Sequence, residues 1–225
     1  MNRRGFLGLM PLLAAASPSP AKVSRWDVIT VGNLSRNRYW GEADNKAVRE
    51  VLCTCTLIRG EGYALLVDPS VPDAGTMAKD LNRRTGLSLD DITAIFVTHE
   101  HGDHVAGIAH FPKVPWYASA AVAEVLNQSP KFAAKKMEAA PRAFFDGIDV
   151  IPTPGHTRGH HSLRFDCDGR SIAVVGDAVA TLDFWRDRRS FFNAVDPAQG
   201  AKTMDYLASI ANIIVPGHDN YFLSK

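Results

Sequence analysis

Four potential metal ligands lie within six consecutive residues of this 225-residue sequence. They are three histidines and an aspartate in segment 99–104, and such imidazole and carboxylate groups are the donors that zinc and iron bind in proteins. Three further candidates follow at wide spacing, each directly after a glycine. Seven donors exceed the four of a tetrahedral zinc site but suit two ions that share a bridging group. The sequence therefore predicts a two-metal hydrolytic site made of His99, His101, Asp103, His104, His156, Asp177 and His218.

Each ligand cluster follows a short apolar run that is typical of a β-strand. Loops at strand ends can converge on one edge of a sheet, where rigid elements hold several side chains on one point. The strands expected to position the ligands are Ala94–Val97, Ile148–Pro152, 171–175 and 213–215.

The rest of the chain alternates strand-like and helix-like segments. Further strands are expected at 28–31, 51–58, 64–67, 115–118 and 162–166, and helices at 73–85, 119–127 and Pro197–Ile210. Strand-rich stretches interleaved with helices fit an α/β fold in which helices cover the outer faces of two mixed sheets, an αββα sandwich. No linker or repeat divides the chain, so residues 22–225 are predicted to form a single domain.

The first 21 residues resemble an export signal instead. Arg3 and Arg4 precede an apolar run that is followed by small residues and prolines, and this arrangement is typical of the twin-arginine type. The run is shorter than the about 20 residues that a membrane span needs. We therefore expect a periplasmic or otherwise exported protein that engages the twin-arginine export machinery.

Composition and cysteine content limit the possible partners. The formal net charge is +1, which lacks the basic excess typical of nucleic-acid binders, so a small-molecule substrate is expected. Cys53 and Cys55 are two apart in a strand-like run, where disulfide geometry is unfavourable. We expect these two thiols and that of Cys167 to be buried and reduced.

The order His-x-His-x-Asp-His, Gly-His, Gly-Asp and Gly-His resembles the metallo-β-lactamase superfamily over the whole predicted domain. The resemblance implies that His99, His101 and His156 hold a first zinc. It implies that a second zinc binds Asp103, His104 and His218, and that Asp177 bridges the two ions. Iron or manganese also suits this donor set.

The implied enzyme is a hydrolase that uses a metal-bridging hydroxide on a small ester, thioester or lactone, with Asp103 orienting the hydroxide and transferring the proton. Asp177 resembles the bridging aspartate of glyoxalase II and the acyl-homoserine lactone lactonases, and it argues against β-lactam hydrolysis. Lactonases carry a tyrosine three residues later, where this chain has Ala180. Two alternatives stay open, a mononuclear iron enzyme similar to persulfide dioxygenases and a phosphodiesterase or nuclease of the same fold.

Two further expectations concern residues around the ligands. The Thr-x-Gly-His pattern that contains His160 recurs in relatives. We expect His160 to contact the metal ligands and hold them in position without binding the metal itself. Trp185, Arg188 and Arg189 follow Asp177 closely and are predicted to clamp the substrate at the rim.

Overall fold

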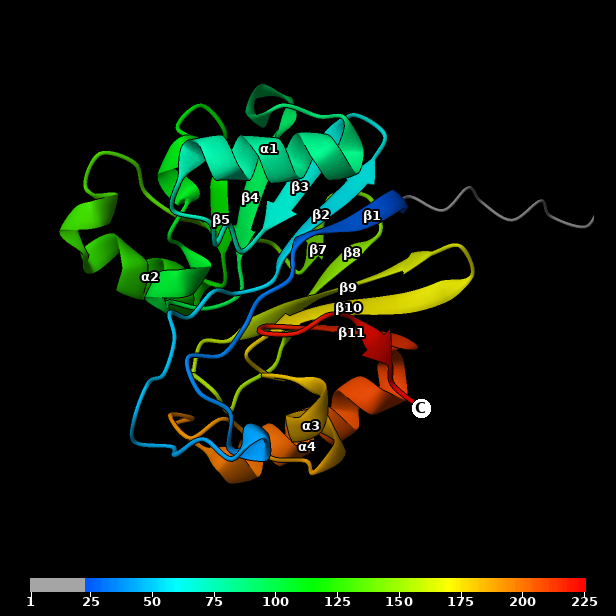
Figure 1. Cartoon of the computed structure of the whole chain (residues 1–225). Coiled ribbons are helices and arrows are strands. Elements are labelled where there is room, and N and C mark those ends of the chain that lie inside the picture. The colour runs from blue at the N-terminus through cyan, green and yellow to red at the C-terminus, as the bar shows by residue number, and fades with distance from the viewer. Residues whose placement is uncertain (1–22) are drawn as a thin grey trace, which may run out of the picture.

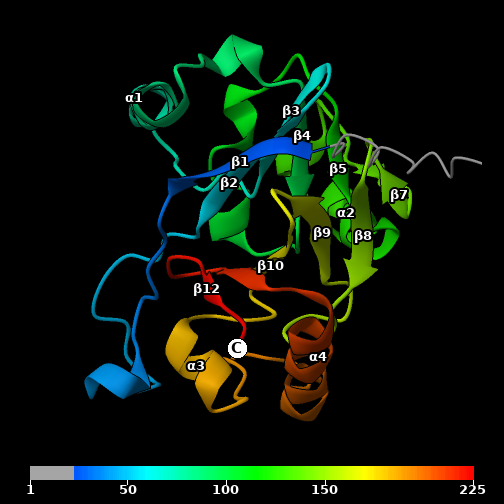
Figure 2. The same ribbon diagram turned by 90° about the vertical axis from the view of Figure 1, so that its right-hand side faces the viewer.

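The computed structural model describes residues 23–225, which form four layers (Figure 1). Two six-stranded sheets face each other, and helices cover the outer face of each. The turned view shows α1 (Ala74–Thr85) beside the first sheet and α3 (Leu182–Arg186) and α4 (Pro197–Ile210) beside the second (Figure 2). The predicted αββα sandwich of two mixed sheets is therefore confirmed. The export-signal prediction falls on residues outside those described.

The first sheet has the strand order β1-β2-β3-β4-β5-β6. The pairs β3–β4, β4–β5 and β5–β6 are parallel, and the other two are antiparallel. The carboxyl ends of β3 and β4 therefore share one edge of the sheet. The strands are β1 (Val23–Thr30), β2 (Cys55–Gly60), β3 (Tyr63–Val67), β4 (Ala94–Val97), β5 (Trp116–Ala118) and β6 (Glu138–Ala139).

The second sheet has the order β12-β11-β10-β9-β8-β7. Only β10 and β11 are parallel, so their carboxyl ends also share an edge. Its strands are β7 (Ala143–Phe144), β8 (Ile148–Pro152), β9 (His161–Cys167), β10 (Arg170–Gly176), β11 (Ile213–Pro216) and β12 (Phe222–Leu223).

Three apolar layers hold the sandwich together. Alternate residues of β4 point to opposite faces, so Phe96 packs between the sheets while Ile95 packs under the helices of the first sheet. Burial on both faces explains why this strand reads as a continuous apolar run. The third layer joins the second sheet to the last two helices. The helices are α1 (Ala74–Thr85), α2 (Ala120–Gln128), α3 (Leu182–Arg186) and α4 (Pro197–Ile210).

Helix ends follow the local sequence signals. The Asp73 side chain accepts a hydrogen bond from the Thr76 backbone at the start of α1, and Gly86 ends that helix with φ of 77°. The bounds of β4, β8 and α4 match the predicted ones. The run predicted as a strand over 51–58 is shorter, because β2 begins at Cys55 and Leu52 makes only an isolated bridge with Asn33. Helix α3 was not predicted.

The three cysteines are buried and free, as expected. Among the described residues, every helix is too short or too polar to cross a membrane.

Candidate metal centre

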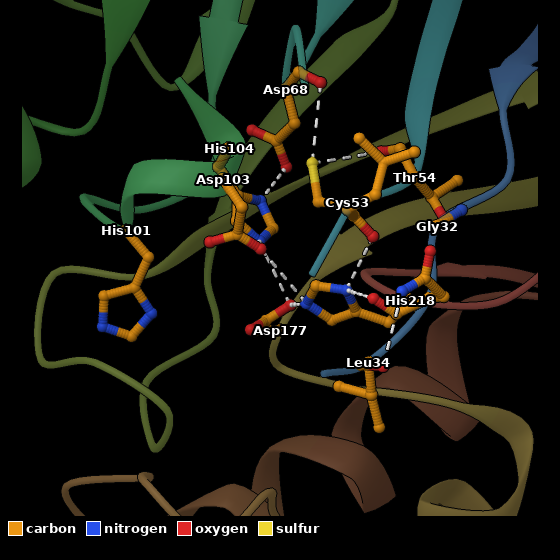
Figure 3. Close-up of polar contacts among 12 residues, drawn as sticks. Gly32, Leu34, Cys53, Thr54, Asp68, His101, Asp103, His104, Asp177 and His218 are labelled. Atoms are coloured by element: carbon orange, nitrogen blue, oxygen red, sulfur yellow. Dashed lines mark hydrogen bonds and ion pairs between the residues drawn. The ribbon is translucent and has the colours of Figure 1, made fainter. Parts of the chain in front are cut away.

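The seven predicted ligands converge at the strand edges. Figure 3 shows His101, Asp103, His104 and His218 around Asp177. Oδ1 of Asp177 lies 3.0 Å from Nε2 of His218 and 3.3 Å from Nε2 of His104. Its Oδ2 lies 3.2 Å from Nε2 of His156 and 3.9 Å from Nε2 of His99. The two oxygens of this carboxylate therefore face two different pairs of imidazoles.

The remaining two residues complete these pairs. Nδ1 of His101 lies 2.9 Å from Nε2 of His156. Oδ2 of Asp103 lies 3.6 Å from Nε2 of His218 and 3.7 Å from Nε2 of His104. Two clusters result, in which the donor atoms lie within 4.8 Å of one another: His99, His101, His156 and Asp177 form the first, and Asp103, His104 and His218 form the second. This division is the one that the sequence resemblance implies.

Backbone carbonyls fix the tautomer of His218. Its Nδ1 lies 3.0 Å from the carbonyl oxygen of Leu52 and 3.2 Å from that of Asn33. Carbonyl oxygens only accept, so Nδ1 carries a proton and Nε2 is the ring nitrogen that is placed to bind a cation.

Asp68 fixes His104 and, through a threonine, His99. Its Oδ2 accepts hydrogen bonds from Nδ1 of His104 and from Oγ1 of Thr98, both at 2.8 Å. The Thr98 oxygen, having donated its proton, accepts from Nδ1 of His99 at 3.1 Å. Each imidazole is thereby held with its Nε2 atom toward Asp177.

The sequence analysis missed Asp68, although a signal was present. It directly follows β3, as the ligand clusters follow their strands, and its backbone has a positive φ of 51°. Strained backbone of this kind at a non-glycine residue recurs at functional sites.

The buried donor atoms of this centre fit a bound cation. Nε2 of His99, Nε2 of His104 and Oδ1 of Asp177 are buried without a hydrogen-bond partner. Unsatisfied buried polar atoms are costly, whereas cations bound at the two clusters would coordinate all three. Five imidazoles with two carboxylates form the nitrogen-rich donor set that zinc prefers. These residues therefore make a divalent-metal site.

Electrostatics divide the donors into two groups. Burial lowers the pKa of His104, but Cys53, Asp68 and Asp177 outweigh that effect and hold it well above its usual value. Burial likewise lowers the pKa of His218, but Asp177 raises it above the usual value. Both imidazoles must therefore lose a proton to bind a cation, whereas three other donors are already in their ligand forms.

Burial holds the pKa of His99 well below its usual value and lowers that of His156 to about 4. Burial raises the pKa of Asp177, but His218, His104 and His156 outweigh that effect and hold it well below the usual value. Near neutral pH, His99 and His156 are neutral and Asp177 is ionised.

Two glycines let the backbone approach the centre. A Cβ at Gly217 would collide with Oδ1 of Asp177, and one at Gly176 would collide with Oγ1 of Thr98. Gly176 also has a positive φ of 45°. The glycines before Asp177 and His218 are therefore required sterically.

His160 lies behind the first cluster. It is fully buried, its ring stacks on His99 with centroids 5.0 Å apart, and its Nδ1 lies 2.9 Å from Oγ1 of Thr153. This position is consistent with the predicted supporting role.

The pocket beside the metal centre has a volume of about 280 Å³. The residues predicted to clamp the substrate do not line it. Trp185 is buried against Phe222. The guanidinium of Arg188 lies over the Trp185 ring, and its Nε donates a hydrogen bond to Asp205 at 2.9 Å. Neither these residues nor Arg189 lines the pocket, so the clamp prediction does not match the geometry. The pocket is lined by Leu34, Ser35, Val51, His101, Gly102, Asp103, Asp177, Phe191, Phe192, Asn193 and His218.

Comparisons with known proteins agree with this geometry. A family model described as the metallo-beta-lactamase superfamily matches residues 48–218. The chain is 34% identical over 208 residues to a hydroxyacylglutathione hydrolase of Aeromonas hydrophila, covering 89% of this chain and 67% of that protein. It is 27% identical over 160 residues to metallo-beta-lactamase domain-containing protein 1 of Rattus norvegicus, covering 68% of this chain and 61% of the relative. The match thus spans about three fifths of that relative's length.

A solved structure shows the same fold. A mutant of AiiA from B. thuringiensis with N-decanoyl-L-homoserine bound at its active site superposes with a TM-score of 0.61 at 21% identity, covering 84% of this chain and 88% of that one.

Proposed function

Since the chain belongs to the metallo-β-lactamase superfamily, we propose that it is a dinuclear zinc hydrolase that acts on a small ester, thioester or lactone. One observation carries the proposal: Asp177 presents one oxygen to His99 and His156 and the other to His104 and His218. A carboxylate shared in this way suits two ions held side by side.

Two bound zinc ions would supply a water that ionises near neutral pH and a Lewis acid that polarises the scissile carbonyl. The protein's own contribution is to hold the donors in place before the substrate arrives, through Asp68 and the carbonyls of Asn33 and Leu52. Asp103 lines the pocket and is partly exposed, so its carboxylate is placed to orient the attacking water and to accept its proton.

The names of the relatives support the substrate class. One relative is a hydroxyacylglutathione hydrolase, hence a thioester hydrolase by name, and one structural neighbour is bound to an N-acyl homoserine. Both names concern acyl compounds. Ester, thioester and lactone hydrolysis share one chemical step, the attack of water on an acyl carbon.

Elemental analysis of protein purified without added metal tests the proposal. We expect close to two zinc ions per chain, together with hydrolysis of at least one ester, thioester or lactone. A single iron with no second ion would overturn the proposal in favour of oxygen-dependent sulfur chemistry. Two zinc ions with activity on phosphodiesters alone would point to the nuclease alternative.

We also propose that residues 1–21 direct export to the periplasm by the twin-arginine route. The paired Arg3 and Arg4 before a short apolar run support this proposal. That route carries folded proteins, so the metal site could be filled before export.

A further inference from the structure

One wall of the pocket beside the metal centre is apolar. Leu34 and Val51 come from the two ends of the long connection between β1 and β2, and Phe191 and Phe192 come from the segment between α3 and α4. The ligand side chains form the opposite wall. A substrate whose carbonyl lies at the metal centre therefore places its substituents against hydrocarbon and aromatic groups.

The same backbone pair positions the apolar wall and one of the metal ligands. Asn33 and Leu52 pair through two backbone hydrogen bonds and close the base of the β1–β2 connection. Their carbonyls also accept from Nδ1 of His218. Leu34 and Val51 are the next residues on the loop side of this pair, so their positions are fixed relative to a metal ligand.

Part of the wall is open to solvent without an evident structural need. Val51 is 42% exposed and Phe192 is 47% exposed. The guanidinium carbon of Arg36 lies 3.8 Å from the Phe192 ring centroid and holds the ring by a cation–π contact. Exposed apolar groups gathered beside a catalytic centre mark a binding surface.

The pocket offers little to a charged substituent. Apart from the carboxylates and imidazoles of the metal centre, its lining in the described part of the chain is apolar or neutral. An anionic group on the apolar wall would lose hydration, and the guanidinium beside it, that of Arg36, lies over the Phe192 ring. The volume of about 280 Å³ holds roughly nine water-sized groups. This space fits an acyl chain of roughly six to eight carbons.

We propose that Val51 and Phe192, supported from below by the buried Leu34 and Phe191, bind the uncharged hydrocarbon chain of the substrate's acyl group. The inference rests on the proposed hydrolase function and narrows it to medium-chain acyl esters, thioesters or lactones. The preferred substrate therefore differs from the charged peptide thioester named for the Aeromonas relative.

The test uses two readouts on the zinc-loaded protein. The first is kcat/KM for a series of nitrophenyl esters from acetate to octanoate, together with a hydroxyacylglutathione. The second is the affinity for butyrate, hexanoate and octanoate measured by calorimetry, which requires no turnover. Each added methylene should raise both quantities about two- to fourfold, because the burial is partial. The hydroxyacylglutathione should react more slowly than the octanoate ester.

Variants at Phe192 locate the effect. Its ring is half-exposed, so Phe192→Ala should fold normally, lower kcat/KM for the octanoate ester about tenfold and leave the acetate ester within about twofold. Phe192→Leu should restore most of the loss. Val125→Ala is the matched control, because it removes a similarly exposed apolar side chain on α2, outside the pocket.

The outcomes separate the inference from the function on which it rests. Ester hydrolysis with no dependence on chain length, or equal losses for acetate and octanoate in Phe192→Ala, would overturn the inference alone. A preference for the glutathione thioester that disappears in Arg36→Met would show that Arg36 binds an anionic group beside the apolar wall. That result would also overturn the inference. If no acyl compound is hydrolysed by protein that holds two zinc ions, the proposed function fails, and calorimetry still decides whether the wall binds the chain.

Discussion

Replacing Asp68 with asparagine tests whether the metal centre depends on the residue that orients its histidines. Asp68 is fully buried, and its carboxylate accepts three hydrogen bonds of 2.8 Å, from the backbone and hydroxyl of Thr98 and from Nδ1 of His104. Asparagine has the same shape but only one acceptor oxygen. If that oxygen keeps the hydrogen bond from the backbone N–H of Thr98, the side-chain NH2 of the asparagine faces Nδ1–H of His104. Two donors then face each other.

The geometry sets the size of the effect. His104 escapes the clash by moving its proton to Nε2, which removes the lone pair that faces Asp177, or by turning away. Loss of a partner that orients a metal-binding histidine lowers metal affinity about 10- to 100-fold, or about 1.4–2.8 kcal/mol. We expect the larger part in the second cluster, because His104 contacts Asp68 directly while His99 does so through Thr98.

Zinc titration of metal-free protein against a competing chelator measures both binding steps. The matched control is Asp73→Asn, since Asp73 likewise accepts from the backbone and hydroxyl of one threonine, at the exposed start of α1. Thermal unfolding of the metal-free variants separates loss of metal binding from loss of the fold. Two zinc ions bound to Asp68→Asn with wild-type affinity would refute the reasoning.

Three further changes test other parts of the same account. Asp177→Ala should abolish tight binding of both ions, because each oxygen faces one cluster, and a variant that still binds one zinc tightly by elemental analysis would show that Asp177 is not shared. Chelation of the metal should lower the unfolding temperature, measured by calorimetry, by about 5–10 °C. This shift is expected when a ligand present at roughly 100 times its dissociation constant is removed from a domain of this size. An unchanged unfolding temperature would contradict a metal buried in the fold. Replacing both Arg3 and Arg4 with lysine should keep the precursor in the cytoplasm, as cell fractionation would show, whereas normal export would rule out the twin-arginine route.

The elements that could be predicted are those whose signals are local. Segment 94–97 is apolar throughout because β4 is covered on both faces, and α4 begins at Pro197 after the Asp196 cap. Helix α3 has only five residues and lies in a charged stretch, so no periodicity distinguishes it from a loop. The premature start predicted for β2 has a similar cause, since segment 51–54 alternates as a strand does but makes a bridge only at Leu52.

The ligand set was readable because its histidines and aspartates stand together in motifs after strands. The environment around them was not. Trp185 and Arg188 look like substrate contacts in the sequence, yet their partners Phe222 and Asp205 come from distant segments that turn both side chains away from the pocket. Phe191 and Phe192 line it instead, a few residues further along. Tertiary packing decides which side chain of a mixed aromatic and basic segment faces the substrate.

The way in which the histidines are held bears on when the metal binds. Nδ1 of His218 is tied to backbone carbonyls, that of His104 to Asp68, and that of His99 to Thr98, and all three contacts are made by the protein alone. Contacts within the protein therefore direct the Nε2 atoms toward Asp177. The metal-free chain should thus fold with its centre preformed, and zinc should add stability without ordering new structure. Amide hydrogen exchange distinguishes the two cases. Protection in β4, β10 and β11 that is already present before zinc is added supports a preformed centre, whereas protection that appears only with zinc would mean that the ion organises these strand ends.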